Sequence, residues 1–147
     1  FYNYLKQPWK CQEKVRYIMD TFYGNKPDAL SGNDDCGQMS AWYIFNTMGF
    51  YPTAPSSNVY NLGSPGLAAV DMKMSNGKHL RMTTGNWSAR NVFVKEVYLN
   101  GKKYDKSYIT YNDIKDGADL HFVMSSRPNY KRGVAERAVP PSVSEKR

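Results

Sequence analysis

The segment from residue 35 to 48 places large apolar side chains around nearly the whole circumference of one predicted helix. These side chains are Met39, Trp42, Tyr43, Ile44, Phe45 and Met48. A helix that is apolar on every side is buried among other elements and does not keep one face in water. We therefore expect a helix from about Asp35 to Met48, stopped by Gly49 and packed among other helices.

One further long helix is predicted over residues 8–23. Pro8 suits the first helical turn, and Gly24 follows the predicted end. Apolar residues recur there at helical spacing: Trp9, Val15, Ile18, Met19 and Phe22. Two such helices need partners, and the remaining sequence predicts no third long helix. We therefore expect a truncated architecture whose missing partners lie upstream of Phe1.

After Tyr51-Pro52 the pattern changes to short segments rich in Val, Tyr, Phe and Thr, separated by Pro, Ser and Asn. Strands are predicted at 59–62, 69–74, 79–84, 92–99 and 120–124. Asn76-Gly77 and Asn100-Gly101 predict tight turns, and Thr110–Asp113 predicts one capped helical turn. The chain is thus predicted to be α+β, with helices over 1–51 and a small antiparallel β-sandwich over 52–129.

The formal net charge of +7 comes heavily from the region after Ser125. With Pro140-Pro141, this region predicts a flexible basic tail over 130–147. No basic recognition motif accompanies the charge, so we expect no nucleic-acid partner. No apolar run approaches the ~20 residues of a membrane span. Cys11 and Cys36 are wrongly spaced for a zinc site and do not predict a disulfide.

The loop that enters the second helix carries the most distinctive polar residues. Asn33, Asp34 and Asp35 stand together just before the helix, and Gln38 follows them. Carboxylates at a helix N-terminus have a structural explanation, because they cap free N–H groups and complement the helix dipole. The same oxygens are also suited to holding a hard cation or to activating a water molecule. The residue pattern alone leaves these interpretations open.

The segment 31–42, with the sequence Ser-Gly-Asn-Asp-Asp-Cys-Gly-Gln-Met-Ser-Ala-Trp, resembles a motif of the family 92 glycoside hydrolases. Residues 7–10 and 49–52 share this resemblance, which extends to about residue 129. These enzymes are calcium-dependent exo-α-mannosidases. The resemblance implies that residues 1–51 are the last helices of an (α/α)₆ barrel, followed by a C-terminal β-sandwich.

The resemblance also implies inverting hydrolysis of terminal α-mannose, most commonly α-1,2-linked. Inversion places the two catalytic carboxyl groups roughly 6.5–9.5 Å apart, so the neighbours Asp34 and Asp35 cannot easily be that pair. The family motif implies Asp35 as the base and Asp34 as its companion. Asn33 and Asp35 are then the candidate ligands for Ca²⁺. Glu13 matches no catalytic position, so the general acid is expected upstream and the isolated chain inactive.

The family further implies mannose-containing glycans as partners, of the N-glycan or yeast-mannan type, together with the remaining N-terminal part of the enzyme. It implies a periplasmic, surface or secreted location in a Bacteroides-type bacterium. Two alternatives stay open: a carbohydrate-binding β-sandwich module and a scaffold that has lost catalysis. His79 and His121 are interpreted as polar residues of a strand face, and Trp9 and Trp42 as packing residues.

Overall fold

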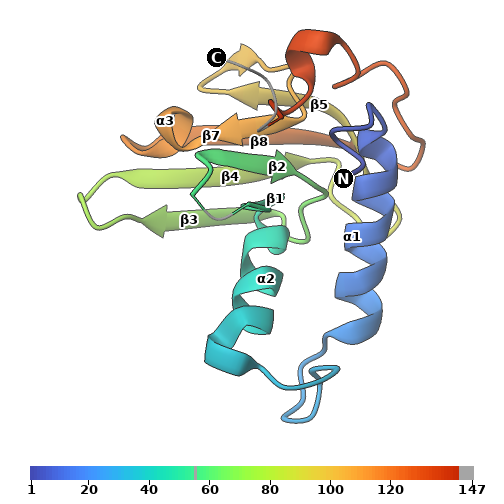
Figure 1. Ribbon diagram of the computed structural model, residues 1–147, viewed down its shortest axis with the longest axis vertical. Coiled ribbons are helices and arrows are strands. Elements are labelled where there is room, and N and C mark those ends of the chain that lie inside the picture. Colours follow the sequence, from blue (N-terminus) through green and yellow to red (C-terminus); the bar gives the residue numbers. More distant parts are fainter. Residues whose placement is uncertain (55, 143–147) are drawn as a thin grey trace.

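The computed structural model describes residues 1–54 and 56–142, with two long helices beside two packed sheets (Figure 1). The helices are α1 (Pro8–Phe22), η1 (Asp35–Gly37), α2 (Gln38–Thr47), α3 (Tyr111–Ile114) and η2 (Glu136–Ala138). The strands are β1 (Phe50–Tyr51), β2 (Val59–Leu62), β3 (Ala69–Lys73), β4 (His79–Gly85), β5 (Phe93–Leu99), β6 (Lys102–Lys103), β7 (Tyr108–Thr110) and β8 (Ala118–Ser125). The predicted α+β class is confirmed.

Helix α1 begins with Pro8 at its N-terminal end, as predicted, and docks on the sheets partly through buried polar side chains. Gln12 is only 3% exposed, and its Oε1 accepts a hydrogen bond of 3.0 Å from the Val94 N–H. Arg16 is 6% exposed and donates from Nη1 to the Pro65 carbonyl at 2.9 Å. The helix is therefore fixed to backbone atoms of the sandwich as well as by apolar packing.

Helix α2 ends as the sequence predicts, because Gly49 follows it with a φ of +89°. Its apolar side chains are not all covered, since Tyr43 is 39% and Ile44 57% exposed. Within the described residues 1–54 and 56–142, α1 is the one long helix beside it (Figure 1). The burial expected for this helix is therefore incomplete within this part of the chain.

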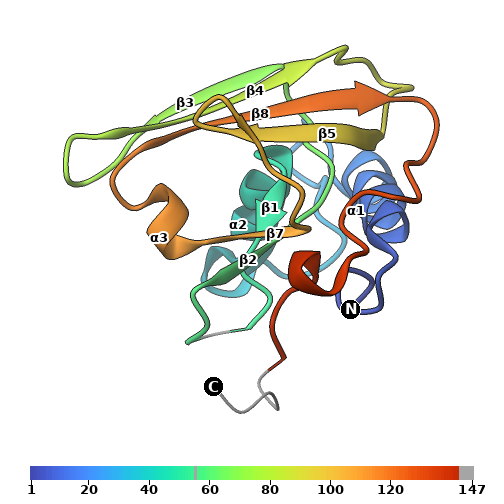
Figure 2. The same cartoon turned by 90° about the horizontal axis from the view of Figure 1, so that it is seen from above.

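The hydrophobic core lies between a three-stranded sheet, β1-β2-β7, and a five-stranded sheet, β3-β4-β8-β5-β6, which form two layers (Figure 2). The smaller sheet contributes Phe50, Leu62 and Ile109, each at most 2% exposed. The larger sheet contributes Leu80, Met82, Val94, Val97, Leu120, Phe122 and Met124. Alternation of buried and exposed residues along β4 and β8 produces this one-sided core.

The prediction of a wholly antiparallel sandwich is wrong at the centre of the larger sheet, where β4 and β8 run parallel. After β5 and β6 the chain crosses to the other layer as β7 and α3, and then returns as β8 (Figure 2). This long excursion lets β8 enter the sheet in the direction of β4, which a tight hairpin would not permit. All the other strand pairs are antiparallel.

The predicted turns are confirmed in the structure. Gly77 has a φ of +77° between β3 and β4, whereas Asn100 and Gly101 have φ values of +50° and +75° between β5 and β6. At Asn100-Gly101 both central residues have a positive φ, which is the signature of a two-residue hairpin turn, whereas at Asn76-Gly77 only the glycine has one. At α3, Thr110 and Asp113 form a reciprocal capping box.

Residues 130–142 do not form the solvated tail that the sequence predicts. Arg132 is only 8% exposed, and the Ala138 carbonyl accepts hydrogen bonds from the Ser107 N–H and hydroxyl. The Arg132 side chain is held inside the fold because its guanidinium donates hydrogen bonds to two backbone carbonyls. The remaining residues of the predicted tail, 143–147, lie outside the described part of the chain.

Gly49 should be intolerant of a side chain. A Cβ built there would lie 2.9 Å from Phe122 Cζ, and the φ of +89° is strained for any L residue. We predict that Gly49→Ala lowers the free energy of unfolding by about 2–3 kcal/mol, measured by urea denaturation. Gly77→Ala is the matched control, because φ is similar but no atom lies within 4 Å, and should cost about 1 kcal/mol. Equal losses would contradict the packing argument.

Candidate active site

The acid loop, residues 31–37, joins the end of the α1–α2 connection to the first turn of α2. A short 3₁₀ turn, η1, precedes the helix, and Cys36 and Gly37 both take left-handed conformations with φ values of +55° and +72°. Gly37 accepts this conformation without strain, whereas Cys36 does so at a cost. The two left-handed residues reverse the chain, so the residues before them face the first turn of α2.

Asp34 caps the first turn of α2 through its side chain, although Gly37 occupies the N-cap position. Its Oδ1 accepts hydrogen bonds from the Met39 and Ser40 N–H groups at 2.8 and 3.1 Å, and its Oδ2 accepts one from the Ser40 hydroxyl at 2.6 Å. The Ser40 hydroxyl, and then the backbone N–H groups, hold the pKa of Asp34 below its usual range. The carboxylate is therefore ionised at neutral pH and committed to the helix N-terminus.

Asp35 and Asn33 are exposed and differ from Asp34 in having free polar atoms. Within residues 1–54 and 56–142, no hydrogen bond or ion pair engages the Asp35 carboxylate or the Asn33 amide. The structure thus separates two sequence neighbours into a structural acid and an acid that is open to bind or react. The sequence pattern left that choice open, and the contacts of Ser40 resolve it for Asp34.

A cluster of aromatic rings joins the end of α1 to α2, next to the acid loop. Tyr23 stacks on Trp42 at 5.5 Å and on Tyr43 at 4.9 Å between ring centroids, and Trp42 also contacts Tyr51. Trp42 therefore packs within the protein, as the sequence suggests. Burial, and then the charges of Asp34 and Tyr51, raise the pKa of Tyr23. Sequence reasoning missed Tyr23, although its place directly after α1 brings it to α2.

A hollow of about 480 Å³ lies beside this cluster, lined in part by Tyr23, Leu30, Ser40 and Tyr43. It combines aromatic and hydroxyl groups next to the acid loop, which are the usual components of a ligand pocket. No local sequence pattern indicates this hollow, because its walls come from two separate segments, α2 and the residues that follow α1. The acid loop and the hollow together form the candidate site.

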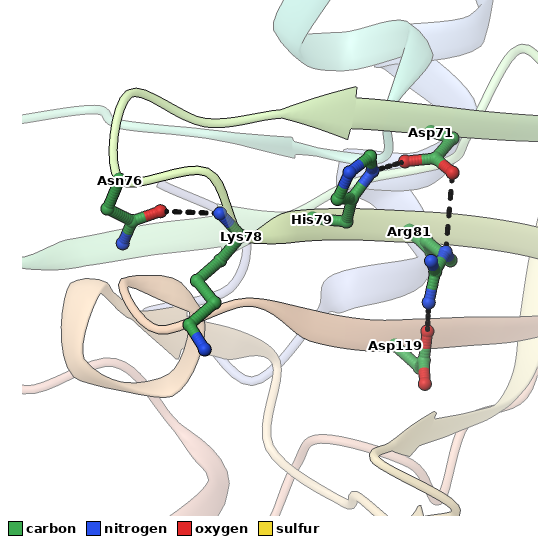
Figure 3. Close-up of polar contacts among 6 residues, drawn as sticks. All are labelled: Asp71, Asn76, Lys78, His79, Arg81 and Asp119. Atoms are coloured by element: carbon green, nitrogen blue, oxygen red, sulfur yellow. Dashed lines mark hydrogen bonds and ion pairs between the residues drawn. The ribbon is translucent and has the colours of Figure 1, made fainter.

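No metal cluster is formed by the protein residues themselves in the described ranges 1–54 and 56–142. His79 and His121 serve the strand face, as predicted. His79 Nδ1 lies 2.5 Å from Asp71 Oδ1, and Arg81 bridges Asp71 to Asp119 across β3, β4 and β8 (Figure 3). His121 contacts Thr83 at 2.8 Å. Both cysteines are free.

A model of the glycosyl hydrolase family 92 catalytic domain matches residues 1–126, which include the acid loop and both sheets. The chain belongs to glycosyl hydrolase family 92. The resemblance inferred from the segment 31–42 is therefore confirmed. Among the described residues, none of the helices is long and apolar enough to span a membrane.

Solved family 92 structures share this fold at high similarity. One is a family 92 α-mannosidase from Bacteroides thetaiotaomicron, with 68% identity and a TM-score of 0.95. The match covers 98% of this chain and 19% of that protein. Another is an inverting family 92 mannosidase from the same organism, with 35% identity and a TM-score of 0.90; 98% of this chain covers 20% of it.

A curated protein from Arthroderma benhamiae, described as an uncharacterized secreted glycosidase, is 27% identical over 145 residues. The match covers 97% of this chain and 19% of that protein. The family 92 chain described here therefore spans about a fifth of the length of the relatives it matches.

Removal of the Asp34 cap should loosen the first turn of α2. We predict that Asp34→Asn accelerates amide hydrogen exchange at Met39 and Ser40, because the charge-assisted bonds weaken. Asp28→Asn is the matched control, since Asp28 is exposed in the same connection and makes no such bond. Exchange that is unchanged at both amides in Asp34→Asn would refute the capping role.

The same cap gives an expected pH dependence. Because folding lowers the pKa of Asp34, its contribution to stability is present above the unfolded value of about 3.9. That contribution is lost as the pH falls through the lower folded pKa. Titration of the Asp34 carboxyl carbon by NMR should therefore give a midpoint below about 3.9. A midpoint above that value would contradict the hydrogen-bond geometry.

Proposed function

We propose that the chain is the C-terminal portion of an exo-acting α-mannosidase that hydrolyses terminal α-1,2-mannosidic linkages with inversion and depends on calcium. One observation carries the proposal: at the N-terminus of α2, Asp34 caps the helix while the carboxylate of the adjacent Asp35 stays unengaged. The membership of family 92 and the α-mannosidases among the solved neighbours support the same function.

Asp35 is the residue proposed to act as general base. Its exposed carboxylate can accept a proton from a water molecule, which then attacks the anomeric carbon from the face opposite the leaving group. Asp34 keeps the loop in place and is proposed to act as a positioning residue, because its oxygens already accept three hydrogen bonds.

The general acid must come from outside Asp34 and Asp35. The Asp34 carboxylate already accepts three hydrogen bonds at the start of α2, so it is not free to protonate the leaving oxygen of a substrate. Glu13 lies exposed on α1 and is not adjacent to the acid loop in sequence. We therefore propose that a carboxylic acid from the rest of the longer protein protonates the leaving oxygen, and that the isolated chain is inactive.

Calcium is compatible with the donor chemistry of the loop but needs more ligands than this chain supplies. Asn33 and Asp35 offer an amide oxygen and a carboxylate, both hard donors that Ca²⁺ accepts. Ca²⁺ usually takes six to eight oxygen ligands, so other groups must complete the shell. A bound cation there would assist the orientation of sugar hydroxyls.

The uncovered apolar residues of the two helices support a missing helical partner. Ile44 and Tyr43 on α2, and Tyr17 and Phe22 on α1, are each at least 39% exposed. Large apolar side chains exposed on two neighbouring helices are consistent with a surface that another element covers. We propose that α1 and α2 are the last helices of an (α/α)₆ barrel, completed by the N-terminal part of the enzyme.

The proposed substrates are mannose-containing glycans of the N-glycan or yeast-mannan type. A periplasmic, cell-surface or secreted location in a Bacteroides-type bacterium is proposed with them. The support is the Bacteroides source of the solved neighbours and the secreted glycosidase among the relatives. Among the described residues after 52, the exposed large aromatic side chains are Trp87, Tyr111 and Tyr130, which lie in three separate segments; this gives little support to the alternative of a carbohydrate-binding module.

The activity test uses the full-length protein with α-1,2-mannobiose. Asp35→Asn should reduce kcat by about 10²–10⁴-fold, because an amide cannot accept the proton from water. Asp28→Asn should retain activity, since the Asp28 side chain is exposed and lies outside the acid loop. The 147-residue chain alone should be inactive with or without Ca²⁺. Wild-type activity in Asp35→Asn would exclude Asp35 as the base.

A further inference from the structure

Arg132 is a buried cation without a paired carboxylate. Its side chain donates from Nη2 to the Lys106 and Tyr104 carbonyls at 2.8 and 3.4 Å. Within residues 1–54 and 56–142, its Nε has no acceptor, and no carboxylate lies within ion-pair distance of it. Because a buried charge is costly without compensation, an anionic partner would stabilise this arrangement.

The charge persists at neutral pH. Burial lowers the pKa of Arg132 to about 10, while Asp105 and Tyr104 act in the opposite direction. Asp105 therefore attracts the guanidinium without forming an ion pair with it. The side chain remains a cation with unused donor capacity.

Three lysines meet Arg132 around a hollow of about 210 Å³ between the β5–β6 hairpin and the chain that follows β8. They are Lys95, Lys103 and Lys131. Glu96 and Asp105 also line the hollow, and Glu96 pairs with Lys103 at 3.5 Å. Four cations face two carboxylates, so the lining keeps a net positive charge that attracts anions.

Asn129 fixes two sides of this hollow. Its Nδ2 donates to the Lys95 carbonyl at 2.9 Å, at the irregularity in β5, and its Oδ1 accepts from the Lys131 and Arg132 N–H groups at 3.0 and 3.3 Å. The backbone that carries three of the cations is thereby tied together. A site whose donors are held before binding loses less entropy on binding.

We propose that this hollow, called the Arg132 hollow, binds a small tetrahedral oxyanion, either as a free ion or as the ester group of a sugar. Its volume is several times the ~30 Å³ that one water molecule occupies, so an anion of phosphate size fits. Guanidinium and ammonium groups are the usual partners of such oxyanions. The segment 130–142 and the acid loop lie at opposite ends of the molecule, so this binding is separate from the proposed hydrolysis (Figure 1).

The test is isothermal titration calorimetry on the full-length protein at low ionic strength, with inorganic phosphate in one arm and a hexose 6-phosphate in the other. Saturable binding in the millimolar range is expected in at least one arm, with none for the unmodified hexose. Lys131→Gln should weaken it by about fivefold or more, since one charge-assisted contact is lost. Equal affinities in both arms indicate the free ion, and tighter binding of the ester indicates a glycan substituent.

Lys102→Gln is the matched control. Lys102 is exposed on β6, carries the same charge and does not line the hollow. It should leave the dissociation constant unchanged. Lys131 is exposed as well, so its substitution tests the site without risking the buried Arg132. The proposal is overturned if neither anion binds saturably, or if Lys102→Gln weakens binding as much as Lys131→Gln does.

Discussion

The position of the acid loop depends on how α1 is fixed to the sandwich. Gln12 accepts a hydrogen bond from the Val94 N–H of β5, and Arg16 donates one to the Pro65 carbonyl, which precedes β3. Asn3, just before α1, donates to the Leu62 and Ser107 carbonyls at 2.9 and 2.8 Å. These buried hydrogen bonds are specific in direction, which apolar contacts are not. They hold the N-terminal helix at one orientation, and the connection that follows it must then meet α2 at a fixed place.

Local patterns in the sequence were sufficient for most of the fold. Helical spacing, alternation along the longer strands and the Asn-Gly turns depend on neighbouring residues, and all of them appear where predicted. The short strands β1, β6 and β7 were missed because two or three residues show no periodicity. The acid loop was predicted from the resemblance of the segment 31–42 to the family motif, and not from periodicity.

Contacts between distant segments could not be predicted in this way. The direction of β8 beside β4 depends on a crossing through the other layer, and no residue pattern records it. The burial of Arg132 depends on carbonyls of residues 104 and 106, so its charge suggested solvent. The residue pattern alone also did not separate the capping carboxylate of Asp34 from the unengaged one of Asp35, because the contact of Asp34 with the Ser40 hydroxyl depends on the turn between them.

The parallel pairing of β4 with β8 has a consequence for the speed of folding. Strand β8 is inserted between β4 and β5, although the chain makes β5, β6, β7 and α3 before it reaches β8. Closing such a long loop costs chain entropy before its contacts provide any compensation. The larger sheet therefore closes late, and until then β4 and β5 each present an unpaired edge that another chain can occupy.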